Sequence, residues 1–224
     1  RMGCVVFHYD MLGYADSRQL PHDGGFGDAQ AEQWGLSPFG LQTWNSLAAL
    51  DFLAGRPDVD PARLAVSGAS GGGTQTFVLG AVDPRPAVLF PAVMVSTGMQ
   101  GGCSCENASY LRIDAGNVDF AALAAPRTLA LTGADDWTIR LEEDTLPDLR
   151  RLYEALGVED RVHGWCYREH PHNYNLVARE HLYDLLATEF ELPRFEEEPE
   201  LVPLDPDRLS VYGEGYPRPE AGHR

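Results

Sequence analysis

The sequence predicts an α/β fold in which helices cover a mostly parallel β-sheet. Apolar runs typical of buried strands alternate along the chain with segments whose apolar residues recur at helical spacing, as such a sheet requires. The length of 224 residues suits one domain of this kind, and a hydrophobic fraction of 44% with 10% aromatics excludes a disordered chain. No stretch approaches the roughly 20 apolar residues that a membrane helix requires.

The first half of the chain supplies two strands and two helices. The apolar run at 4–9 predicts a buried strand, and a loop rich in Gly, Asp and Gln follows at 10–37. Leucines near helical spacing predict a helix at 38–54. A short strand expected at 63–67 then leads into a helix of small residues at 71–81.

The second half continues the alternation and ends in a different kind of segment. A strand is expected at 87–95, although Pro91 interrupts its row of N–H donors. The remaining elements are expected to be strands at 127–132 and 161–167 and helices at 141–156 and 176–190. Residues 193–224 are rich in proline and acidic side chains, which predicts a tail or linker after a folded domain of residues 1–192.

Charge and cysteine content narrow the choice of partners. The chain has 34 acidic and 17 basic side chains and a formal net charge of −17, so neither nucleic acid nor an anionic membrane is expected as a partner. Four cysteines are too few for a disulfide framework. We expect Cys103 and Cys105 to be too close in sequence to bridge easily, and a lone Cys-x-Cys lacks the second ligand pair of a zinc site. The sequence therefore predicts no metal and no cofactor.

The strongest local motif is Gly68-Ala69-Ser70-Gly71-Gly72, a Gly-x-Ser-x-Gly between an expected strand and an expected helix. This context is typical of a nucleophile elbow, a strained turn that lifts the serine hydroxyl above the sheet. Glycines are needed because side chains would crowd so tight a bend. The Gly71 N–H at the helix start is a candidate donor to an oxyanion.

A serine nucleophile needs a base and an orienting acid, which in this architecture follow later strands in the order acid, then histidine. Asp135 and Asp136 come just beyond the strand expected at 127–132, after Gly133 and Ala134. His170 and His172 follow the strand expected at 161–167. All three groups are therefore predicted at the same edge of the sheet.

The segments GCVVFHYDMLGYADS, GLQTWNSLAALDFL, SGASGGGTQ, MQGGCSCENA, GADDWT and HPHNYN together resemble the acetylxylan-esterase-like branch of the α/β-hydrolase superfamily. The resemblance covers residues 3–190. It implies an α/β-hydrolase fold, serine-dependent ester hydrolysis and carbohydrate esters as substrates. It also places the acid directly before Trp-Thr and the base directly before a polar-Tyr pair, which selects Asp136 and His172.

Alternatives to this triad remain open. Asp135 resembles the first Asp of the pair in prolyl-oligopeptidase-like hydrolases, and His170 competes with His172. Glu106 is a third candidate acid, because glucuronoyl-esterase-like relatives can place their acid after the strand expected here at 87–95. The other histidines are expected to be surface or packing residues, namely His8, His22, His163, His181 and His223.

Four further residues are candidates for lining the substrate pocket. Tyr14 lies in a stretch that resembles the loop after the fourth strand of this fold, where it would border the oxyanion site. Gln42 and Trp44 belong to the first long helix, and Trp137 is next to the acid. Their aromatic rings offer stacking faces for a sugar, although core packing explains these residues equally well.

The resemblance also makes residues 4–9 the fourth strand of the fold. The third strand, which lies between the fourth and fifth and whose loop supplies a second oxyanion N–H, has no counterpart here. We therefore expect an N-terminal part, with any targeting signal, to lie outside this sequence, and the strand at 63–67 to lack a neighbour. On this interpretation the chain alone is poorly stable and weakly active; relatives of this kind are often exported.

These observations favour a serine esterase acting on acyl or uronoyl esters of carbohydrates. An oligopeptidase-like amide hydrolase and a non-catalytic binding module with the same fold are the alternatives. A metal hydrolase using His170, His172 and Asp135 is less favoured, because a proline separates the histidines and the serine motif is intact.

Overall fold

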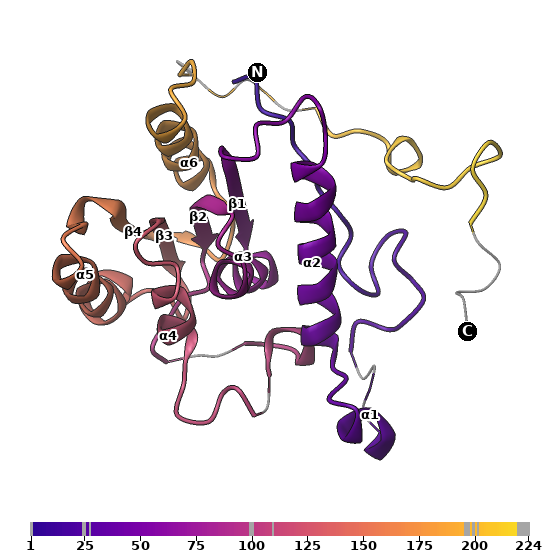
Figure 1. The fold of residues 1–224 in the computed structure, drawn as a ribbon, viewed down its shortest axis with the longest axis horizontal. Helices are drawn as coiled ribbons and strands as arrows, with labels where there is room; N and C mark the ends of the chain where they lie inside the picture. Colours follow the sequence, from indigo (N-terminus) through magenta and orange to yellow (C-terminus); the bar gives the residue numbers. More distant parts are fainter. Residues whose placement is uncertain are drawn as a thin grey trace.

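A four-stranded parallel sheet forms the centre of the protein (Figure 1). The computed structural model describes residues 2–23, 26, 28–98, 101–108, 110–194, 198, 200 and 202–218. The strands lie side by side in chain order: β1 (Leu64–Ala69), β2 (Pro86–Ala92), β3 (Thr128–Asp135) and β4 (Val162–Pro171). All three pairings are parallel, which confirms the predicted α/β fold.

Helices cover both faces of this sheet and its β1 edge (Figure 1). They are α2 (Pro38–Ala54), α3 (Gly71–Val82), α4 (Asn117–Ala122), α5 (Leu146–Ala155) and α6 (Leu176–Glu189), whereas α1 (Ala29–Gln33) lies apart from the sheet, near the start of α2 (Figure 1). In the described ranges, none of them combines the length and the apolar character that a membrane crossing requires.

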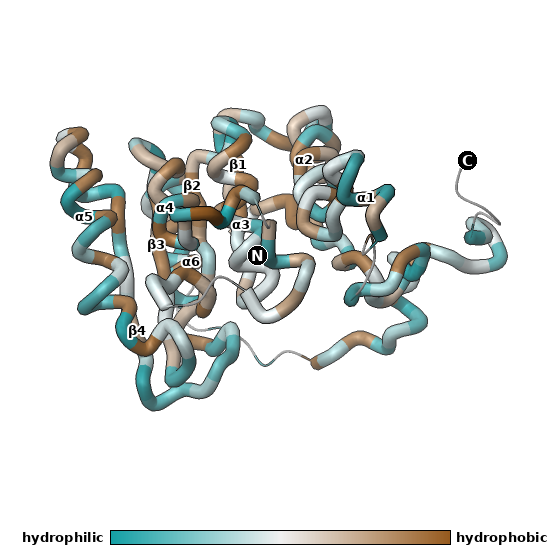
Figure 2. The backbone as a smooth tube through the Cα atoms, turned by 90° about the horizontal axis from the view of Figure 1, so that it is seen from below, coloured by the Kyte–Doolittle hydropathy of each residue, from teal (hydrophilic) through white to brown (hydrophobic). Residues whose placement is uncertain are grey.

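The inner strands β2 and β3 bury both faces, which is why their sequences are almost continuously apolar. In β2, Leu89 packs into the cluster that includes α3, α4 and α5, whereas Val88 and Phe90 pack into the cluster that includes α6. In β3, Leu129 belongs to the first of these clusters and the next residue, Ala130, to the second, because successive side chains of a strand point to opposite faces. The inner strands are mostly hydrophobic, whereas α5 alternates between polar and apolar residues (Figure 2). Each large side chain buried in this way stabilises the fold by about 1.5–3 kcal/mol.

Local signals explain why α2 begins and ends where the sequence predicts. Ser37 precedes the helix, and its hydroxyl accepts the Gly40 N–H at 3.0 Å. Pro38 occupies the first turn, where its missing N–H costs nothing. Gly55 ends the helix. The predicted bounds 38–54 are confirmed. They were predictable because these capping residues act through their own neighbours in the sequence.

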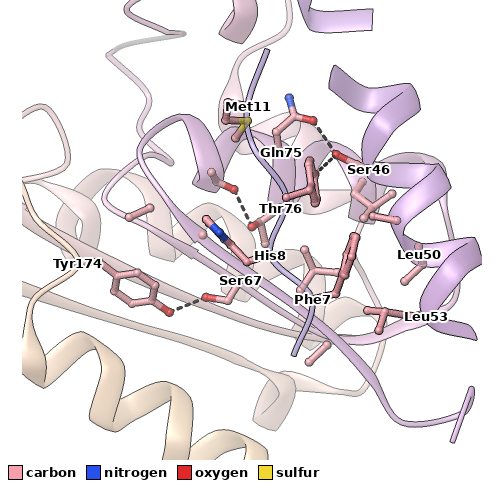
Figure 3. Close-up of a pocket in the computed structure, with 18 residues that line it drawn as sticks. Phe7, His8, Met11, Ser46, Leu50, Leu53, Ser67, Gln75, Thr76 and Tyr174 are labelled. Carbon is pink, nitrogen blue, oxygen red and sulfur yellow. Dashed lines mark hydrogen bonds between the residues drawn. The ribbon is translucent and has the colours of Figure 1, made fainter. Parts of the chain in front are cut away.

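The strand predicted at 4–9 is wrong. These residues belong to no strand, and Val6 is 83% exposed. A strand exists only as part of a hydrogen-bonded ladder, and no described strand pairs with the outer edge of β1. Between that edge, the 7–11 segment and α2 lies a cavity of about 470 Å³ (Figure 3).

Other element bounds differ from the prediction by a few residues. β2 ends at Ala92 rather than 95, and Val93 has a positive φ of 46°. β3 and β4 continue further than predicted, to Asp135 and Pro171, because they pair with each other over that length. The helix expected at 141–156 begins with a π-turn before α5, and α4 was not predicted.

Segments of the predicted tail contact the domain at two places. The Glu198 carboxylate pairs with the Arg179 guanidinium of α6, with 2.6 Å between Oε1 and Nη2. Further along, the Val211 N–H donates to Asp16 Oδ2 at 2.7 Å, and Arg218 Nη1 donates to the Asp16 carbonyl oxygen at 2.7 Å. The hydrogen bond from Val211 lowers the pKa of Asp16.

Candidate active site

Ser70 lies on a sharp turn between β1 and α3. Its backbone has φ 55° and ψ −121°, a conformation that costs a non-glycine residue of order 1–3 kcal/mol. The Ser70 N–H donates to the Ala92 carbonyl oxygen at 3.0 Å, which fastens the turn to the end of β2. A Cβ on Gly68 would lie 2.5 Å from the Gly72 backbone, and a Cβ on Gly73 would lie 2.8 Å from Met94 Cβ. The turn is thus as tight as the glycine motif predicts.

The predicted catalytic groups follow strands that end at one edge of the sheet. Ser70 follows β1, Asp136 follows β3 and His172 follows β4. Because all four strands are parallel, their carboxyl ends face the same side, where ligands of open α/β sheets bind.

Asp136 and His172 are in direct contact. The His172 Nδ1–H donates to Asp136 Oδ2 at 2.6 Å, and the Asp136 side chain is only 5% exposed. The other oxygen, Oδ1, accepts the Thr138 N–H at 2.6 Å and also the Thr138 hydroxyl. These bonds hold the carboxylate toward the imidazole. Thr138 was not singled out from the sequence; its signal is its place two residues after an aspartate, where such turn bonds form.

The competing residues lie elsewhere. Asp135 is the last residue of β3 and is exposed. His170 is inside β4 and packs edge-on against Tyr167, with 6.3 Å between ring centroids. His172 instead packs against Trp137, with ring centroids 4.5 Å apart. Of these candidates, the structure brings together Asp136, Trp137 and His172.

Ser70 is not joined to this pair by a hydrogen bond. Within the described part of the chain, the Ser70 hydroxyl has no hydrogen-bond partner, and His172 bonds to Asp136 alone. Hydrogen bonds between catalytic groups are often long or unformed until substrate binds.

Glu106 lies beside the elbow. It follows β2 and is buried, and its Oε1 lies 3.1 Å from the position of a Cβ on Gly71. Its Oε2 accepts the N–H groups of Gly102 and Cys103 at 2.5 and 3.2 Å. This carboxylate therefore orders the loop next to Gly71, and it makes no hydrogen bond to a histidine in the described residues.

The other proposed substrate residues occupy different surroundings. Tyr14 is exposed and packs edge-on against His22, with 4.6 Å between ring centroids. Gln42 is buried between two loops, and Trp44 is 69% exposed on α2. Among these three, no side chain contacts Asp136 or His172 through a hydrogen bond or ring contact that the structure records.

The cavity at the β1 edge was not predicted as a site. Gly68 and Gly72 of the elbow form part of its wall, whereas Asp136 and His172 do not. On the same wall the hydroxyls of Ser67 and Tyr174 hydrogen-bond at 2.5 Å (Figure 3). Burial raises the pKa of the Tyr174 hydroxyl to about 12.

Cys103 and Cys105 form a disulfide, so the expectation that they are too close is wrong. A single 3₁₀ turn begins at Ser104 and keeps the two Cα atoms 5.4 Å apart, within the usual range for a disulfide. His22, expected to be a surface or packing residue, lies beside both sulfurs.

Comparisons with known proteins link this fold to esterases. No protein-family model matches the sequence, and no curated protein matches it. The methylesterase BT1017 has a TM-score of 0.75 and 28% identity over 92% of this chain and 46% of its own. A CE15 glucuronoyl esterase from Caldicellulosiruptor kristjansonii has a TM-score of 0.61 and 20% identity over 79% of this chain and 58% of its own. A glucuronoyl esterase from Sporotrichum thermophile has a TM-score of 0.59 and 19% identity over 94% of this chain and 68% of its own.

This chain therefore spans about half the length of the methylesterase. Its α/β-hydrolase fold is one that solved carbohydrate esterases share.

Proposed function

We propose that this chain contains the catalytic centre of a serine esterase that cleaves acyl or uronoyl esters of carbohydrates. The observation that carries the proposal is the hydrogen bond of 2.6 Å between His172 and the buried Asp136, at the sheet edge where the Ser70 elbow also ends. A buried acid that orients a histidine, at the same sheet edge as a strained serine turn, supports an arrangement that activates a hydroxyl for attack on an ester.

In the proposed reaction, Ser70 Oγ attacks the ester carbonyl carbon and its proton passes to His172 Nε2. Asp136 keeps the Nδ1–H tautomer and stabilises the imidazolium that results. The Gly71 N–H donates to the oxyanion of the tetrahedral intermediate. The imidazolium then protonates the departing alcohol as its bond to the acyl carbon breaks, which leaves the acyl group on Ser70 Oγ. Water, deprotonated by His172, attacks this acyl carbon; the bond to Oγ breaks, the carboxylic acid leaves, and His172 returns the proton to Oγ.

The substrate class rests on the neighbours and on one side chain. The similar structures are named as a methylesterase and as glucuronoyl esterases, which supports esters of sugars or of their carboxylates. The acetylxylan-esterase-like specificity suggested by the sequence motifs belongs to the same class. Trp137, which packs on His172, offers an aromatic face to a sugar ring next to the base.

A comparison of two serines tests the proposal. Ser70→Ala should lower hydrolysis of p-nitrophenyl acetate and of methyl glucuronate by about 10⁴-fold or more and abolish labelling by a fluorophosphonate. Ser67→Ala is the matched control, because Ser67 lies three residues away and bonds to Tyr174 instead. It should keep most of the activity and all of the labelling.

The second candidate function is a non-catalytic module that binds a sugar ester, and the absence of a Ser70–His172 hydrogen bond in this structure favours it. This alternative predicts neither turnover nor serine labelling in the unmodified protein. It also predicts that Ser70→Ala binds a sugar ester as tightly as the unmodified protein.

A further inference from the structure

A histidine and two cysteines from distant parts of the chain meet at the loop after β2. His22 Nε2 lies 3.2 Å from Cys105 Sγ and 3.6 Å from Cys103 Sγ. These three atoms lie within 4.8 Å of one another. In this structure the sulfurs form a disulfide. We propose that, once this disulfide is reduced, His22, Cys103 and Cys105 bind a thiophilic divalent cation such as zinc.

The hydrogen bonding of the His22 ring directs a lone pair at the sulfurs. Nδ1 lies 2.7 Å from the Leu12 carbonyl oxygen, which can only accept, so the proton of the neutral ring is on Nδ1 and Nε2 is bare. A disulfide has no hydrogen to offer this lone pair, whereas a thiol or a metal ion satisfies it. A backbone carbonyl on the far nitrogen is also the usual support of a zinc-bound histidine.

The fold holds the two loops in this arrangement independently of the sulfurs. Gln42 of α2 is buried between them: its Oε1 accepts the Leu12 N–H at 3.2 Å and its Nε2 donates to the Cys105 carbonyl oxygen at 3.4 Å. Gly13 has φ 84°, and a Cβ there would lie 2.3 Å from the backbone nitrogen of His22. The loop therefore closes tightly on His22, and the three groups should stay together when the disulfide opens.

Binding requires reduction first. A reductant supplies two electrons, the sulfur–sulfur bond breaks, and each sulfur takes up a proton. The cation then displaces both thiol protons and binds two thiolates and the neutral imidazole. One histidine and two cysteines form a known zinc donor set with a fourth position left for water, and thiolates disfavour Mg²⁺ and Ca²⁺. Cys105 is buried but Cys103 and His22 are half-buried, so a cation can enter from solvent.

The test uses the whole chain in a Cys4→Ser/Cys166→Ser background, which removes the two free thiols. A water-soluble phosphine reduces the disulfide, becoming its oxide with oxygen from water, and is removed without air. Zinc is then titrated against a chromophoric chelator, and Co²⁺ is added separately to detect thiolate-to-metal charge transfer. We expect one zinc per reduced chain, a proton released from each thiol, and no binding above background by the oxidised protein.

Two variants and a control decide the ligands. His22→Ala and Cys105→Ser should each weaken zinc binding at least about 100-fold, more than the loss of an outer partner typically causes. His8→Ala, at an exposed histidine, should bind as tightly as the background protein. Circular dichroism of each reduced protein establishes whether it is folded. If Cys105→Ser does not fold, His22→Ala still tests the proposed site. If the folded, reduced chain fails to bind zinc, or if His22→Ala binds as tightly as the background, the pair is a structural disulfide only.

Discussion

Among single residues, Asp135 and Asp136 show how a carboxylate acquires its role from the direction in which its side chain points. Asp135 ends β3 and Asp136 follows it, but only the Asp136 side chain is buried, bonded to His172 and bonded to Thr138. The backbone of Ser70 also depends on its neighbours. Its positive φ of 55° belongs to a turn in which Gly68 and Gly72 lie so close together that a Cβ on Gly68 would not fit.

The two aspartates should therefore respond very differently to the same change. Asp136→Asn keeps the shape but removes the acceptor that fixes the His172 tautomer, so kcat/KM for an aryl acetate should fall by about 10⁴-fold. The Asp135 side chain is exposed and has no hydrogen-bond partner among the described residues, so Asp135→Asn should cost about 10-fold or less. The result that contradicts this assignment is a larger loss in Asp135→Asn; if neither variant is impaired, Glu106 becomes the leading acid.

Two glycines of the elbow offer a matched test of its tightness. Gly68→Ala places a Cβ 2.5 Å from the Gly72 backbone, which cannot move aside easily, and should destabilise the fold by about 1–3 kcal/mol. Gly72→Ala meets nothing within 4 Å and lies in α3, so it should stabilise the fold by about 0.5–1 kcal/mol. Urea unfolding of both variants measures the difference in their free energies of unfolding. Equal free energies would show that the turn between β1 and α3 has room for a Cβ at Gly68.

At the scale of elements, aromatic and imidazole rings join β4 to α6. Trp165 of β4 stacks on His181 of α6, with ring centroids 3.9 Å apart. His163, also in β4, stacks on Trp165 at 5.9 Å. The Tyr167 hydroxyl hydrogen-bonds to His181 Nε2. Burial lowers the pKa of both histidines, because the imidazolium form is poorly solvated there.

This contact should make stability fall in mild acid. The unfolded chain binds protons on these histidines near pH 6.5, whereas the folded chain binds them only at lower pH, so their contribution is complete above about pH 6.5 and is lost as the pH falls below it. His181→Phe should reduce the slope of unfolding free energy against pH between about pH 7 and 5, measured by urea unfolding. His8→Ala, at an exposed site, should leave the slope unchanged; an unaltered slope in His181→Phe would exclude His181 as the source.

At the scale of the whole molecule, the C-terminal segment leaves α6 and returns toward the 10–22 loop (Figure 1). Glu198 is its contact with α6, accepting hydrogen bonds from Arg179 and from the Tyr183 hydroxyl. The hydrogen bonds from Arg179, and then from Tyr183, lower the pKa of Glu198 to about 2. The cavity at the β1 edge, which no described strand fills, lies on the α2 side of the sheet.

Removing the charge of Glu198 should release this segment. Glu198→Gln loses the ion pair, so trypsin should cleave after Arg194 several-fold faster at neutral pH. Glu200→Gln, at an exposed residue two positions away, is the control and should be cleaved at the original rate. Because the pKa of Glu198 is lowered, the contact is complete above about pH 4.5 and weakens as the pH falls toward 2. Equal cleavage of the two variants would show that Glu198 does not hold the segment.

The sequence by itself determined the features that depend on neighbouring residues. The α2 helix begins and ends at local capping signals, and the glycines around Ser70 determine the turn, so both were predictable. The order of strands and helices followed from apolar periodicity, and with it the sheet edge at which the strands before Ser70, Asp136 and His172 end.

Only the tertiary structure decided the features that depend on partners distant in the chain. Residues 4–9 are apolar enough for a strand, but a strand needs a paired neighbour and none is described beside β1. The hydrogen bond of Asp136, rather than Asp135, to a histidine depends on where His172 lies, 36 residues further along. His22 was uninformative in sequence because 81 and 83 residues separate it from the sulfurs, and local patterns carry no information about contacts at that distance.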